Sequence, residues 1–115
     1  MLVIGLFPSA ASAAQCLDNL AEADFSANDI SLVMKTKSAV EEISDARGPL
    51  TGLSVADLAR KLTELGRSAI DVQSYVQGVR DGGVFIAIDT SDDDVAAAAE
   101  EMLQDGNARH IREIQ

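Results

Sequence analysis

The sequence predicts an α+β fold, in which strands and helices alternate along the chain and share one sheet. Apolar runs of strand length occur, as do segments in which apolar residues recur at helical spacing behind a capping residue. A third observation is that the two ends of the chain have the same pattern. The length of 115 residues fits one domain, residues 1–115.

Residues 1–35 have the pattern of strand, helix and strand. Leu2–Phe7 is a continuous apolar run, which is typical of a strand buried on both faces. Ser9 then stands where a helix N-cap is expected, and alanines and leucines follow every three or four residues as far as Asp24. A second strand is predicted over Ile30–Lys35.

Residues 36–83 begin with a polar, turn-rich stretch and continue with two predicted helices. Ser54–Asp57 and Ser68–Asp71 both match a capping box, and each precedes an apolar stripe at helical spacing. Asp81–Gly83 is expected to end the second helix and reverse the chain, because glycine adopts backbone angles that other residues avoid.

Residues 84–115 repeat the pattern of the first unit. Val84–Asp89 is a nearly all-apolar strand. The hydroxyl of Thr90 or Ser91 is expected to cap the next helix, with Asp92–Asp94 facing the positive end of its dipole. His110–Ile114 is the last predicted strand, short and mixed in polarity.

The two ends align with one another, and the alignment pairs Leu6 with Ile88, Ser9 with Ser91 and Leu20 with Met102. A change of one residue in the turn then pairs Ile30 with Ile111 in the final strands. Two βαβ units with right-handed crossovers predict a ferredoxin-like βαβ…βαβ sandwich, a four-stranded antiparallel sheet with two helices on one face. The expected strand order, 4-1-3-2, puts the two apolar strands in the centre and the charged strands at the edges. Residues 36–83 form a helical insertion between strands 2 and 3.

Both faces of the central strands are apolar. Side chains alternate along a strand, so Ile4 and Leu6 point away from the face that Val3 and Phe7 line. Because the two terminal helices cover only one face, we expect the inserted helices or a second copy of the chain to cover the other.

Composition excludes several classes of function. The chain has 9 Lys and Arg against 19 Asp and Glu, a net charge of −10, which disfavours nucleic acid and anionic membranes as partners. One Cys and one His cannot form an internal disulfide or a typical zinc site, and we expect no cofactor and no metal. No Lys or Arg stands near the apolar start, which we interpret as a strand and not an export signal. A cytoplasmic protein is expected.

Three segments resemble a known family. In the first segment, Val3–Phe7 is followed by a helix of small residues and then by Ala23–Val33. In the second, Tyr75–Ile88, a Tyr and a Gly on a helix are followed by two glycines and an apolar strand. The third is the final turn and strand, Asp105–Ile114. Together they resemble the bacterial heat-induced or general stress protein domain of the YflT type. The resemblance implies a stress-associated cytoplasmic protein, and it carries no catalytic residues to transfer.

The residues that could form an interface or a ligand loop are Arg47, Gly48, Thr51, Tyr75 and Phe85. The loop that holds the first three could cradle an anion, although it lacks the spacing and the lysine of a P-loop. The tyrosine is expected to pack its ring and to direct its hydroxyl to the surface or to a partner.

Other reactive side chains have simpler interpretations. Asp92–Asp94 could bind a hard cation, but their positions match a helix N-terminus. Cys16 lies one position away from an apolar helical stripe and is interpreted as a small, partly buried hydrophobe, since no base accompanies it. No catalytic residues are predicted.

The sequence therefore leaves two functions open. The first is a non-enzymatic stress-type protein that acts through protein–protein contacts or self-association, as a homodimer or with an unknown protein partner. The alternative is a regulatory or sensor domain that binds a small ligand between the sheet and the inserted loop, by analogy with other domains of this fold.

Overall fold

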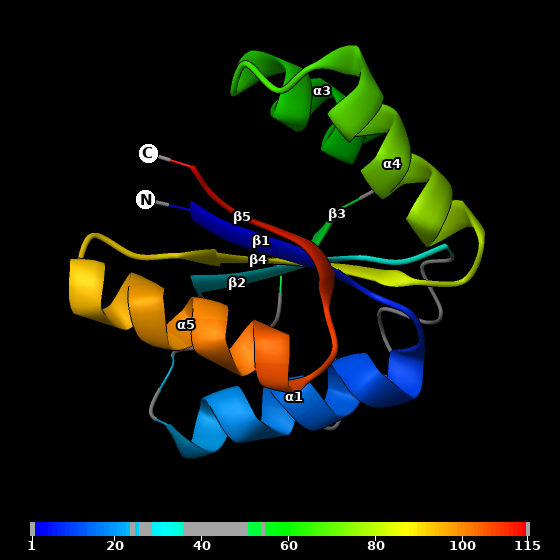
Figure 1. Cartoon of the computed structure of the whole chain (residues 1–115). Coiled ribbons are helices and arrows are strands. Elements are labelled where there is room, and N and C mark those ends of the chain that lie inside the picture. Colours follow the sequence, from blue (N-terminus) through cyan, green and yellow to red (C-terminus); the bar gives the residue numbers. More distant parts are fainter. Residues whose placement is uncertain (1, 24, 26–28, 36–50, 54, 115) are drawn as a thin grey trace.

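The computed structural model describes residues 2–23, 25, 29–35, 51–53 and 55–114. A five-stranded sheet lies between two layers of helices (Figure 1). Its strands are β1 (Leu2–Phe7), β2 (Ile30–Val33), β3 (Thr51–Leu53), β4 (Val84–Asp89) and β5 (Arg109–Ile114). The described helices are α1 (Ala10–Glu22), α3 (Val55–Glu64), α4 (Ala69–Arg80) and α5 (Asp93–Asp105). The predicted α+β class is confirmed.

The strand order is β3-β2-β4-β1-β5, which differs from the predicted order of four strands because the sheet has a fifth. β3 pairs in parallel with β2, so β2 is not the edge strand that the sequence predicts. The other neighbours are antiparallel: β4 lies between β2 and β1, and β5 pairs with the opposite side of β1. The sequence did not reveal this strand because three residues are too few for a periodic pattern; the backbone of Thr51–Leu53 pairs with the side of β2 that faces away from β4.

Two of the predicted helix caps are confirmed. The side-chain oxygen of Ser9 accepts a hydrogen bond from the Ser12 backbone N–H, and α1 begins directly after it. Ser68 does the same for the backbone N–H of Asp71 at the start of α4. The cap predicted at Ser54 lies outside the described residues.

The predicted hydroxyl cap of α5 is wrong. Asp92 is the N-cap, and its carboxylate accepts hydrogen bonds from the backbone N–H groups of Asp94 and Val95. The helix begins one residue after Asp92, which places the hydroxyl of Thr90 too far back; that hydroxyl instead accepts from the Asp92 backbone N–H. The expectation that carboxylates lie at the positive end of the α5 dipole is confirmed, because Asp93 and Asp94 are in its first turn.

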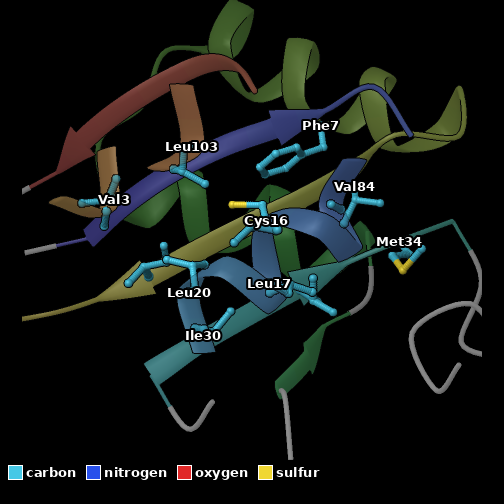
Figure 2. Packing of buried hydrophobic residues seen from close by; sticks show 14 of the residues in the cluster. Val3, Phe7, Cys16, Leu17, Leu20, Ile30, Met34, Val84 and Leu103 are labelled. Carbon is cyan, nitrogen blue, oxygen red and sulfur yellow. The ribbon is translucent and has the colours of Figure 1, made fainter. Parts of the chain in front are cut away.

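α1 and α5 cover one face of the sheet (Figure 1). Figure 2 shows Val3 and Phe7 of β1 pointing into this layer, where Cys16, Leu17 and Leu20 of α1 meet them. The alanines that are fully buried in the same layer are Ala13, Ala96 and Ala99. Such small side chains let both helices lie close to the strands, which explains how a core with few aromatic residues fills its volume.

α3 and α4 cover the other face (Figure 1), so the inserted helices fulfil the role that the sequence assigned to them or to a second copy of the chain. This second-face core contains side chains from four strands, β1, β2, β4 and β5, and from both helices. Its fully buried members include Ile4 and Val33 from the strands and Leu62, Tyr75 and Val79 from the helices. It also forms the surroundings of the candidate site.

Candidate functional site

Two of the five residues that the sequence singles out lie together in the second-face core. The rings of Tyr75 and Phe85 are 5.4 Å apart and meet edge to face at 85°, an arrangement that aromatic pairs prefer. Thr51 lies in β3, away from this pair along the sheet. Arg47 and Gly48 lie outside the described residues.

The hydroxyl of Tyr75 has a structural partner. It donates a hydrogen bond to the backbone carbonyl of His110 in β5, and the two rings are 5.9 Å apart. His110 has a φ of 54°, and the pairing of β1 with β5 is irregular between Ile4 and Leu6, opposite this residue. Burial raises the pKa of Tyr75 to about 12, so the hydroxyl stays protonated at neutral pH. Tyr75 therefore holds an irregular strand in place.

A pocket of about 320 Å³ lies between the same face of the sheet and α3. One wall is a stripe on α3, in which residues three and four positions apart share a face. The residues of this wall are Leu58, Lys61, Leu62 and Leu65. The opposite wall is the sheet itself, from β2 across β4 to β1 and β5.

The pocket has its depth because two small residues lie side by side on adjacent strands. Ser31 of β2 and Ala87 of β4 are paired in register, and both line the pocket. The next pair on the same face, Val33 and Phe85, is larger. Since strand side chains stand out from the sheet, the sheet surface is lower at the smaller pair than at the larger one.

The pocket has an apolar interior and charged residues at its rim. Leu58 and Leu62 are buried, as is Ile114 on the sheet side. Lys61 and Asp89 also line the pocket, but both are exposed. Together with the Ser31 hydroxyl, they supply the polar side-chain groups among the described lining residues. Such a site can enclose an apolar group and meet charges of either sign at its entrance.

A second, more open hollow of about 620 Å³ lies between α5 and the segment that leads into β2. Asp29, Asp89 and Asp94 line it beside Phe25 and Val95. Within the described ranges, however, no three His, Cys, Asp or Glu side chains are grouped so that they could hold a metal ion. The acidic lining therefore gives this hollow no evident chemistry.

Cys16 is a core residue. It is 1% exposed, and its Sγ contacts the Met102 carbonyl oxygen at 3.8 Å. Burial raises the pKa of this thiol to about 11, so it is protonated at neutral pH and is a poor nucleophile. The interpretation of Cys16 as a small hydrophobe is confirmed, but the residue is fully and not partly buried.

Sequence reasoning missed most of the pocket. Lys61 was visible as a charge within an apolar helical stripe, three residues after Leu58 and four before Leu65. Ala87 was visible as the small residue in an otherwise bulky apolar strand. Neither signal could show that Ser31, from a distant part of the chain, stands beside Ala87. Only the pairing of β2 with β4 brings them together.

Comparison with known proteins gives no relative: no family model, no curated protein and no solved structure matches this chain. The resemblance to YflT-type stress protein domains therefore stays a prediction. None of the helices in the described part of the chain combines the length and hydropathy needed to cross a bilayer.

Proposed function

We propose that the chain is a non-enzymatic binding module that holds a small, largely apolar molecule between the sheet and α3. One observation carries this proposal: the 320 Å³ pocket with buried leucines on one wall and a low sheet surface opposite. Of the two functions that the sequence leaves open, the pocket favours the small-ligand domain.

The dimensions of the pocket support this function. Small-molecule sites span roughly 300–1,000 Å³ and combine an apolar lining with a few polar groups, and this pocket falls at the lower end of that range. Burial of a branched side chain of leucine size contributes about 2 kcal/mol. The ligand is therefore expected to be small, with weak to moderate affinity.

Self-association has less support than ligand binding. It was expected through the second sheet face or the inserted helices. α3 and α4 lie over that face, so the outer surface of these helices is the remaining route. Among the described residues, the large hydrophobic side chains that remain exposed are Ile70 at 77% and Val95 at 37%. Homodimer formation stays a prediction, and light scattering across micromolar concentrations tests it.

The finer fold assignment is also a proposal. β1-α1-β2 and β4-α5-β5 are two βαβ units whose strands alternate in the sheet, with β4 between β1 and β2, and this supports a ferredoxin-like fold. A general-stress function and a cytoplasmic location rest on the sequence alone. Transcript levels under heat, acid and salt stress, and microscopy of the tagged chain, test these two predictions.

The binding proposal is tested by a screen and a matched pair of variants. The screen measures the unfolding temperature of the chain with small apolar molecules that carry different polar groups, because a ligand that binds the folded state raises it. Ala87→Leu places a larger side chain in the pocket, since Ala87 is 6% exposed and lines it. Ala98→Leu places the same side chain in the open hollow on the opposite face.

Any molecule that stabilises the wild-type chain is expected to stabilise Ala98→Leu equally and Ala87→Leu much less. Methyl NMR of Leu62 and Ile114 gives a second readout that does not depend on the stability of the variants. The proposal is wrong if no molecule in the screen shifts these methyl signals, or if Ala87→Leu binds as tightly as the wild-type chain.

A further inference from the structure

We infer that the ligand of this pocket is a free amino acid with an apolar side chain, bound as a zwitterion. This inference rests on the proposed function, because it names the ligand class of the same pocket. It is based on three observations: the volume of the pocket, the charges of both signs at its rim, and the charge of the chain as a whole.

The described lining residues place one charge of each sign at the rim, on different elements. Lys61 belongs to α3, and Asp89 ends β4, where it is paired in register with Leu2 of β1. Both residues line the pocket and both are exposed. An ammonium from one side and a carboxylate from the other match the two charged groups that every free amino acid carries on one carbon.

Among the described residues, neither charge has an ion-pair partner. The one ion pair found between described side chains joins Arg60 to Asp57, 2.7 Å apart on α3. Lys61 and Asp89 form no ion pair with each other or with any described residue. In a chain with 19 acidic residues, a lysine that has no ion pair within the described ranges and lies over an apolar pocket is available to a ligand carboxylate.

The interior fits the remainder of such a ligand. A volume of about 320 Å³ accommodates a branched or aromatic side chain, and the buried leucines of α3 face Phe85 and Ile114 across it. The Ser31 hydroxyl on the pocket wall is a further hydrogen-bond partner. The apolar group is therefore expected inside, with both charged groups at the entrance.

Simpler amphiphiles fit less well. A fatty acid would use Lys61 but would leave Asp89 beside its own negative charge. A net anion is also repelled by the chain as a whole, whose formal charge is −10. An alkyl amine would leave Lys61 unmatched. A zwitterion has no net charge and satisfies both residues.

The test measures dissociation constants by NMR titration with three probes that share the leucine side chain. L-Leucine carries both charges, N-acetyl-L-leucine lacks the ammonium, and L-leucinamide lacks the carboxylate. L-Leucine is expected to bind most tightly, and each modified probe roughly fivefold more weakly, since one exposed ion pair contributes up to about 1 kcal/mol.

Two variants assign each ligand charge to its residue. Lys61→Met is expected to weaken binding of L-leucine but not of L-leucinamide, which has no carboxylate and carries the same sign of charge as Lys61. Asp89→Asn is expected to weaken binding of L-leucine but not of N-acetyl-L-leucine, which has no ammonium and carries the same sign of charge as Asp89. Lys35→Met, at an exposed lysine that is not among the pocket residues, is the matched control and should change no affinity.

The outcomes separate this inference from the proposed function. Equal binding of the three probes, or equal loss of all three in both variants, contradicts the amino-acid inference. If only a fatty acid or an uncharged molecule binds, and Ala87→Leu abolishes that binding, the pocket is a ligand site but the inferred class is wrong. If nothing shifts the pocket methyl signals, both fail.

Discussion

Gly83→Ala is expected to destabilise the chain far more than the same change at the neighbouring glycine. Gly83 joins α4 to β4 and is buried. A Cβ on this residue would lie 2.7 Å from the carbonyl oxygen of Phe7 and 2.8 Å from that of Gly78. Both obstacles are backbone atoms, which cannot turn aside as the end of a side chain can.

The size of the effect follows from this geometry. The two carbonyls would have to move by about half an ångström to reach van der Waals contact. Such overpacking costs about 1–3 kcal/mol. The backbone N–H of Gly83 also donates to the Gly78 oxygen at 2.9 Å, and loss of this bond costs about 1 kcal/mol more. We expect a total near 3 kcal/mol.

Gly82→Ala is the control, because it separates backbone strain from steric obstruction. Gly82 has a φ of 103°, but a Cβ there would meet nothing within 4 Å. The strained angle alone costs about 1 kcal/mol. Urea denaturation, followed by circular dichroism, measures both variants. If Gly83→Ala is no less stable than Gly82→Ala, α4 does not approach β1 and β4 as closely as described, and our account of how the second-face helices are held is wrong.

The remaining predictions concern the tyrosine, alkaline pH and the pocket. Tyr75→Phe is expected to lower the free energy of unfolding by about 1 kcal/mol, because the His110 carbonyl loses its hydrogen-bond donor. The rate of amide hydrogen exchange in β5 should rise. An unchanged exchange rate would contradict the role of Tyr75 in holding this strand. Burial raises the pKa of Cys16 from 9.0 to about 11 and that of Tyr75 from 10.0 to about 12. Each folded-state pKa is above its unfolded value, so the stability from these groups is complete below pH 9.0 and is lost as pH rises toward 12. Urea melts of the wild-type chain and Tyr75→Phe between these limits check this, and an equally steep decline in both would rule out a contribution from Tyr75. Ala87→Leu should fold, because the pocket has room for the larger side chain, and should lose ligand binding that Ala98→Leu retains.

The parts of the fold that depend on local signals could be predicted from the sequence. Ser9 and Ser68 cap helices because each hydroxyl reaches a backbone N–H three residues ahead, a contact that spacing alone reveals. The two central strands are continuous apolar runs because both of their faces are covered, and Leu2–Phe7 shows this directly.

What could not be predicted depends on contacts between distant segments. β3 has three residues, too few for any periodicity, and it is a strand because it pairs with β2. The cap of α5 is ambiguous in a run of hydroxyl and carboxyl residues, and only the exact start of the helix selects Asp92. The pocket requires Ser31 beside Ala87 and α3 above both, which no local pattern encodes.

The most direct test of the central claim is a methyl NMR titration of the wild-type chain with L-leucine and uncharged apolar molecules of similar size. The claim predicts that saturating shifts occur at the methyl groups of Leu58, Leu62 and Ile114, which line the pocket, and that Ala87→Leu removes them. Shifts that are confined to α1 and α5, or that persist in Ala87→Leu, would contradict it.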